Sequence, residues 1–236
     1  MRVEILYPEL CNLFGDTGNV KYLKLCLPDA EFIYTSLCDT PAFVSGDADM
    51  VYMGACTESG QEKIIKQLTP YKAKIEEQIN KNTIFLFTGN SMEVLFKYIE
   101  TDEGEKISGL GIFDFYAKRQ MMKRINCVSL CRFQEMDIVG FKTQFTMTYG
   151  DNSDCFFASV EHGIGINNDS KLEGIRKNNF FGTNLVGPLL VMNPYFTEYI
   201  MTLLGVEKPQ VAYRKEALTA YNKRLNEMRT KNMKDH

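Results

Sequence analysis

Short apolar segments alternate with helical segments through the first half of the chain, and this alternation constrains the fold more than any other feature. The apolar segments are residues 2–7, 31–34, 49–53 and 83–87. Between the last two, residues 58–81 place Ile and Leu side chains on one side of a helix, and Pro70 suits the first turn of a second helix. Strands joined through helices of this length imply right-handed βαβ units and a parallel sheet.

The second half of the chain is rich in β-branched and aromatic residues, divided by turn signals such as TYGDNSD. Further strands are expected at residues 125–133, 137–148, 155–161 and 179–186. Residues 195–204 and 211–229 have helical patterns, and the second is a charged helix that would pack on the body of the protein or on a partner. We therefore predict an α/β fold with a central, mostly parallel sheet and a β-rich second half. Residues 1–236 are expected to form one domain, with residues 205–236 as a helical tail.

Composition argues against several functional classes. The 236 residues include 27 basic and 30 acidic side chains, and this net charge of −3 argues against nucleic acid as the main partner. Apolar runs such as residues 185–192 are too short to span a bilayer, and the start MRVEILYPEL does not resemble a signal peptide, so we expect a cytoplasmic protein. The cysteines are odd in number without CxxC spacing, and the only histidines are His162 and His236, so no metal site and no cofactor are expected.

A sharp turn follows the apolar strand at residues 83–87, at an edge where parallel sheets bind their ligands. The segment IFLF-TGNS-MEVLF has the order of strand, turn and helix that builds a nucleophile elbow, with Thr88 as the exposed residue of the turn. Asn90 and Glu93 have the spacing of a helix cap. A threonine nucleophile needs a base, and the local sequence offers no His, Lys or Asp. The pattern alone therefore favours a capped helix after a buried strand.

Six segments, in order along the chain, resemble motifs of class I glutamine amidotransferase domains of the CobB/CobQ type. They are YPELCNLFGDTGNV, DMVYMGACTESGQ, IFLFTGNSMEVL, GLGIFDFYAKR, IVGFKTQFTMT and GIGINNDSKLEGIRKNNFFGTNLVGPLL. Within this family the chain is most similar to the glutaminase subunits of bacterial lipid II isoglutaminyl synthase. The resemblance implies a flavodoxin-like class I amidotransferase fold, glutamine hydrolysis, and delivery of ammonia to a Mur-ligase-like partner that amidates a peptidoglycan precursor.

The sequence departs from these motifs where the family performs its chemistry. In active members an elbow Cys attacks the glutamine amide and the His of LHGP acts as acid and base, but here Thr88 and Val186 stand at those positions. A threonine hydroxyl is a far weaker nucleophile than a thiolate, and valine cannot transfer a proton. The resemblance places a vestigial pocket around these positions, at Gly54, Ala55, Cys56, Gly89, Asn90, Met92 and Gln144.

The glycines of the family's framework are kept, whereas its catalytic residues are replaced. This combination indicates a pseudoenzyme. We therefore expect a subunit that has lost glutamine hydrolysis and acts as a non-catalytic binding or scaffold partner of a Mur-ligase-like amidating enzyme. The alternative is an active subunit that supplies ammonia for amidation of lipid II or, as a cobyric acid synthase-like protein, of a cobyrinate-type acid.

Two single residues and one segment each have both a functional and a structural interpretation. Cys56 is either a displaced nucleophile or a small thiol that fills the place of a glycine. His162 is either a replacement base for Thr88 or a histidine of a surface turn. The segment GDTGN lacks the GK[ST] ending of a phosphate loop, so we expect a helix-entry turn capped by Asp16 or Asn19.

Overall fold

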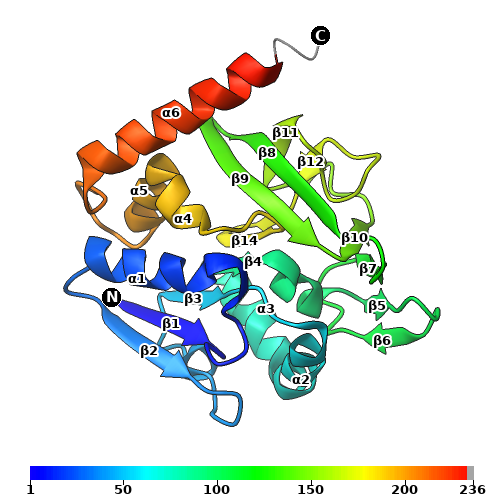
Figure 1. Cartoon of the computed structure of the whole chain (residues 1–236). Coiled ribbons are helices and arrows are strands. Elements are labelled where there is room, and N and C mark those ends of the chain that lie inside the picture. Colours follow the sequence, from blue (N-terminus) through cyan, green and yellow to red (C-terminus); the bar gives the residue numbers. More distant parts are fainter. Residues whose placement is uncertain (233–236) are drawn as a thin grey trace.

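The computed structural model describes residues 1–232 and is built around a six-stranded sheet (Figure 1). Its strands are, in spatial order, β13 (Ile175–Lys177), β14 (Phe180–Thr183), β4 (Ile84–Thr88), β3 (Met50–Met53), β1 (Arg2–Leu6) and β2 (Glu31–Thr35). All neighbouring pairs from β14 to β2 are parallel, and β13 runs antiparallel to β14. The expected mostly parallel sheet is confirmed, and β14 joins it from the second half of the chain.

Helices cover both faces of this sheet because its inner strands are apolar on both sides. The helices are α1 (Asp16–Cys26), α2 (Glu58–Leu68), α3 (Lys72–Asn80), α4 (Leu189–Met192), α5 (Pro194–Leu203) and α6 (Arg214–Asn232), with 3-10 turns η1 (Leu13–Gly15), η2 (Ala42–Ser45), η3 (Thr69–Tyr71) and η4 (Gly89–Leu95). One face packs on α2 and α3, and the other on α1, α4 and α5. Along β4, Phe85 and Phe87 pack on the first side, and Ile84 and Leu86 on the second.

Two smaller four-stranded sheets make the second half β-rich, as expected. One consists of β10 (Thr146–Tyr149), β7 (Tyr116–Arg119), β5 (Tyr98–Glu100) and β6 (Lys106–Ser108), and the other of β12 (Leu172–Glu173), β11 (Ala158–His162), β8 (Ile125–Phe133) and β9 (Met136–Gln144). The single strand predicted over residues 137–148 is wrong, because the chain changes sheets at Phe145. Before this residue β9 pairs with β8, and after it β10 pairs with β7.

The helix expected after the elbow is also wrong, because the chain forms only the short η4 turn and then enters β5. Residues 91–96 are fully buried and leave no polar face for solvent. The backbone carbonyls of Val94 and Leu95 accept hydrogen bonds from the N–H groups of Leu110 and Ile112, both at 2.9 Å. Pairing with a distant segment therefore replaces the hydrogen bonds of an α-helix.

The C-terminal helix α6 lies across the β8–β9 hairpin (Figure 1). Tyr221, Leu225 and Met228 pack against Leu130 and Val139 of this hairpin. The tail predicted for residues 205–236 thus becomes helical at residue 214, while residues 233–236, including His236, lie outside the described part of the chain. None of the helices within residues 1–232 is long and apolar enough to cross a membrane.

Candidate functional site

Thr88 is the last residue of β4 and lies at the carboxyl end of a central strand. The prediction that its side chain is exposed is wrong: the residue is fully buried, with an extended backbone at φ −111°. The Thr88 hydroxyl donates a hydrogen bond to Asp16 Oδ2 at 2.9 Å and lies 3.2 Å from the Tyr52 hydroxyl. Gly89 takes the left-handed conformation of the turn instead, at φ +63°.

Asp16 and Asn19 face this buried threonine, so the prediction that one of them caps α1 is wrong. Gly15 is the N-cap residue of α1, at φ +86°, and no side chain caps this helix. Asp16 Oδ2 accepts the Ala55 N–H at 2.5 Å, and Asn19 Nδ2 donates to Asp16 Oδ1 at 3.1 Å and to the Tyr52 hydroxyl at 2.9 Å. Burial raises the pKa of the Asp16 carboxyl, and its hydrogen bonds act in the opposite direction.

Sequence analysis missed Asp16 as a partner of Thr88 because the two residues are 72 positions apart. One feature of the sequence could have indicated that Asp16 and Thr88 lie close together. Asp16 follows β1 and Thr88 ends β4, so both lie at the carboxyl edge of the same parallel sheet, where functional side chains converge.

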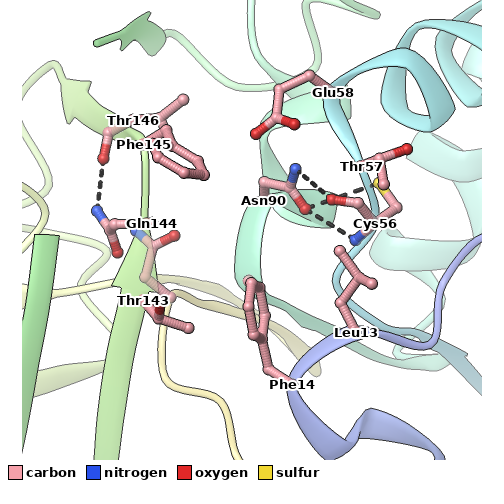
Figure 2. A pocket seen from close by; sticks show the side chains of 12 residues that line it. Leu13, Phe14, Cys56, Thr57, Glu58, Asn90, Thr143, Gln144, Phe145 and Thr146 are labelled. Atoms are coloured by element: carbon pink, nitrogen blue, oxygen red, sulfur yellow. Dashed lines mark hydrogen bonds between the residues drawn. The ribbon is translucent and has the colours of Figure 1, made fainter. Parts of the chain in front are cut away.

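The Asn90 carboxamide pairs with the backbone of Cys56, in the loop that follows β3 (Figure 2). Asn90 Oδ1 accepts the Cys56 N–H at 3.0 Å, and Asn90 Nδ2 donates to the Cys56 carbonyl at 2.9 Å. The predicted cap formed by Asn90 and Glu93 is therefore wrong. The Ala55 N–H donates to Asp16, so the N–H groups of Ala55 and Cys56 both have acceptors inside the protein.

Val186 lies beside the elbow turn, as the resemblance implies for the position of the family's histidine. A Cβ built on Gly89 would lie 3.4 Å from Val186 Cγ1 and 2.6 Å from Ala55 Cβ. The Val186 N–H donates to the Phe141 carbonyl at 2.9 Å, which joins the segment after β14 to β9. Val186 and the turn that follows Thr88 are therefore neighbours in the structure.

A pocket of about 210 Å³ opens between the elbow and the β9–β10 segment (Figure 2). Of the predicted pocket residues, Cys56, Gly89, Asn90 and Gln144 line it. Thr88, Val186, Gly54, Ala55 and Met92 do not line it, and His162 is exposed at the end of β11. The lining residues that sequence analysis missed are Leu13, Phe14, Thr57, Glu58, Thr143, Phe145, Thr146 and Asn184.

An arginine joins the two walls of this pocket. The Arg124 guanidinium lies 5.6 Å from the ring centroid of Phe14 and 5.4 Å from that of Phe145. Arg124 Nε also donates to Thr143 Oγ1 at 2.9 Å. Cation–π contacts of this kind stabilise the approach of the two rings.

Three buried ionisable side chains, Glu93, Lys142 and Glu173, lie behind the pocket. Burial raises the pKa of Glu93 to about 7, although Gln61 Nε2 donates to its carboxylate at 2.9 Å and Thr146 Oγ1 at 2.5 Å. Lys142 and Glu173 form a fully buried ion pair. Glu173 Oε1 also accepts the backbone N–H of Asn184 at 2.8 Å. Within residues 1–232, no three His, Cys, Asp or Glu side chains cluster in a way that could hold a metal ion.

The arrangement of a parallel sheet, an elbow turn and a facing loop defines a class I glutamine amidotransferase fold. A solved glutamine amidotransferase structure superposes on the chain with a TM-score of 0.55 at 12% identity, covering 86% of this chain and 99% of that chain.

The sequence comparisons identify the family. The model of the CobB/CobQ-like glutamine amidotransferase domain matches residues 2–193, and the chain belongs to this family. It is 27% identical to the GatD subunit of lipid II isoglutaminyl synthase (glutamine-hydrolyzing) from Staphylococcus aureus over 195 residues, 80% of this chain and 78% of the relative. The Streptococcus pneumoniae GatD subunit is 25% identical over 208 residues, 86% of this chain and 79% of the relative.

Proposed function

We propose that this chain is a GatD-like amidotransferase subunit that has lost glutamine hydrolysis and acts as a non-catalytic partner of a Mur-ligase-like amidating enzyme. The observation that carries the proposal is the position of Thr88. Its hydroxyl is fully buried, is bonded to Asp16, and does not line the pocket. A side chain in this position cannot attack an amide bound in the pocket.

The surroundings of Thr88 support the loss of hydrolysis. Amide hydrolysis by this family needs a thiolate, an acid–base group and N–H donors for the oxyanion. Val186 has no proton to transfer, and the N–H groups of Ala55 and Cys56 donate to Asp16 and Asn90. Each of the three requirements therefore fails at a different residue.

The expected partner follows from the relatives. Both GatD relatives are subunits of lipid II isoglutaminyl synthase, so they act as parts of an assembly. A chain that keeps their fold without their chemistry is expected to keep a place in such an assembly, where it would stabilise or position the amidating subunit.

A glutaminase assay with and without a Mur-ligase-like amidating subunit tests this proposal. The S. aureus GatD relative, assayed with its own partner, serves as the positive control. We expect stable co-purification with the ligase, no glutamate release above the no-enzyme background, and amidation that requires added ammonium salts. Glutamate release that Thr88→Ala abolishes would contradict the loss of hydrolysis, and failure to co-purify would contradict the scaffold role.

One observation favours a second candidate, an amide or ester hydrolase that uses Thr88. The 2.9 Å bond from the Thr88 hydroxyl to Asp16 is the geometry of a nucleophile and its base. Such an enzyme would need to open the buried network before it reacts. It predicts covalent labelling of Thr88 by a small acylating or fluorophosphonate probe, and labelling should disappear in Asp16→Asn.

A further inference from the structure

Two cysteine thiols meet at the carboxyl edge of the central sheet, beside the pocket. Cys11 belongs to the loop that follows β1, and Cys56 belongs to the loop that follows β3. Both thiols are free, and the two residues are 5% and 2% exposed. A side-chain hydrogen bond joins Cys11 to Cys56 within one packed core cluster. Sequence analysis considered Cys56 alone, because the two cysteines are far apart along the chain.

The backbones of these two loops pack directly against each other. The Leu13 N–H donates to the Ala55 carbonyl at 3.2 Å. A Cβ built on Gly54 would lie 2.8 Å from the Cys11 carbonyl oxygen, so no side chain separates the two loops at this point. The strands that lead into them, β1 and β3, are paired neighbours in the sheet. The cysteines therefore lie on adjacent backbone segments, which is what a disulfide requires.

Of the two thiols, Cys56 is the one at the pocket. Its side chain lines the pocket and donates to Asn90 Oδ1 at 3.7 Å (Figure 2), whereas Cys11 does not line it. The hydrogen bond to Cys56, together with burial, holds the pKa of the Cys11 thiol well above its usual range, so Cys11 is not the thiol that reacts first. A small oxidant that enters the pocket therefore meets Cys56.

We infer that Cys11 and Cys56 form a reversible disulfide, which makes this pocket wall a site of oxidative modification by peroxides. First, the Cys56 sulfur attacks hydrogen peroxide, the O–O bond breaks, and a sulfenic acid and one water form. The Cys11 sulfur then attacks the Cys56 sulfur, and the sulfenic hydroxyl leaves with the Cys11 proton as a second water. Two thiols are oxidised to one disulfide, and one peroxide is reduced to two waters. Glutathione or a dithiol reverses the reaction by thiol–disulfide exchange.

The disulfide links two loops that both contribute to the pocket. Phe14 lies on the loop after β1, Glu58 lies at the end of the loop after β3, and both line the pocket. Oxidation also removes the thiol hydrogen that Cys56 donates to Asn90, while the two bonds between the Cys56 backbone and the Asn90 amide involve no sulfur and remain. Because this chemistry does not use the elbow residue, it is independent of the loss of glutamine hydrolysis.

Peptide mapping of the oxidised full chain tests this inference. The reduced protein is treated with hydrogen peroxide, denatured in N-ethylmaleimide to block the remaining thiols, and digested without a reductant. We expect a linked pair of peptides that contain Cys11 and Cys56, and recovery of all seven thiols after dithiothreitol. The unfolding temperature of the oxidised protein should be higher than that of the reduced protein, because the disulfide restricts the unfolded chain.

Variants separate the roles of the two thiols. In Cys11→Ser the sulfenic acid at Cys56 has no second thiol to react with, so dimedone should label Cys56 at least about tenfold more than in the wild type. Cys26→Ser is the matched control, because Cys26 is also buried but its sulfur accepts the Ala212 N–H. This variant should form the disulfide as the wild type does.

Two results would overturn the inference. One is the absence of a Cys11–Cys56 peptide at peroxide concentrations that oxidise the exposed Cys38. The other is equal dimedone labelling of Cys56 in the wild type and in Cys11→Ser, which would show that Cys11 does not react with the sulfenic acid. The peptide map needs only the wild-type chain, so it decides the question even when a variant does not fold.

Discussion

At the scale of single residues, the site is defined by buried polar side chains that bond to each other. Thr88 forms hydrogen bonds with Asp16 and Tyr52, and Asn90 accepts a hydrogen bond from Cys56 in the loop opposite. The sequence placed Thr88 at the end of a strand and, through the resemblance, Val186 beside it. The direction of the Thr88 side chain could not be predicted from the sequence, because it depends on a hydrogen-bond acceptor contributed by a distant segment.

Glu93 makes stability depend on pH. Its carboxyl has an ordinary pKa of 4.5 when unfolded and about 7 when buried, so the folded state binds the proton more tightly. The unfolding free energy should therefore fall as pH rises from about 4.5 to 7, by at most about 3 kcal/mol, and level off above that. Urea unfolding at pH 5 and 7.5 measures the change, and Glu93→Gln should remove most of it. An unchanged difference in Glu93→Gln would assign the effect to another buried carboxyl whose pKa burial raises, such as Glu4 or Asp16.

Restoring the family's catalytic pair should not restore glutamine hydrolysis. In the double variant Thr88→Cys with Val186→His, the Ala55 and Cys56 N–H groups still donate to Asp16 and Asn90. Loss of one oxyanion donor costs roughly 10²–10³-fold in rate, and two are committed here. Glutamate release should remain near background even when Asn90→Gly frees the Cys56 N–H, because the side chain at position 88 stays buried away from the pocket and the Ala55 N–H still donates to Asp16. Ordinary turnover by the double variant would show that the internal hydrogen bonds do not block the donors.

At the scale of elements, the sequence predicted β1 to β4, α2, α3 and β8 within one or two residues, whereas β13 was not predicted and β14 ends three residues before the end of the predicted strand. The inner strands β3 and β4 are continuous apolar runs buried on both faces, and α2 and α3 have helical periodicity with one buried face. The errors fall where tertiary hydrogen bonds replace local ones. Residues 89–100 have the composition of a helix, but the carbonyls of Val94 and Leu95 bond to residues 110–112. The pocket was predicted on its elbow wall, but on its β9–β10 wall only Gln144 was predicted, because that wall forms only when the chain changes sheets at Phe145.

The elbow turn should be sensitive to a single methyl group. Gly89 has φ +63°, and an added Cβ would lie 2.6 Å from Ala55 Cβ. Gly89→Ala should therefore lower the unfolding free energy by about 2–4 kcal/mol, through backbone strain and overpacking. Gly104, at φ +83° with no described atom within 4 Å of the added Cβ, isolates the backbone contribution, so Gly104→Ala should cost about 1 kcal/mol. Urea unfolding measures both, and equal losses would exclude a steric role for Ala55.

At the scale of the whole molecule, the pocket depends on how the second half of the chain returns to the central sheet. The chain leaves the central sheet after β4, forms the two smaller sheets, and returns to the central sheet as β13 and β14. Lys142 on β9 and Glu173 on β12 form a buried ion pair within one of the smaller sheets. Glu173 also accepts hydrogen bonds from Thr183 and Asn184 at the end of β14, and these bonds join that sheet to the central one. One carboxylate thus connects the hairpin, the returning strand and the pocket wall.

Breaking this pair should affect the entire structure. Lys142→Met leaves the Glu173 carboxylate buried without its cation, and the loss of one member of a buried pair costs about 3–5 kcal/mol. The unfolding free energy from urea titration should fall by that amount in one cooperative step, because Glu173 also bonds to the end of β14 in the central sheet. Lys81→Met, which removes an exposed pair with Glu77, is the matched control and should leave stability nearly unchanged. If Lys142→Met matched that control, the hydrogen bonds of Glu173 to Thr183 and Asn184 would hold the returning strand without the lysine.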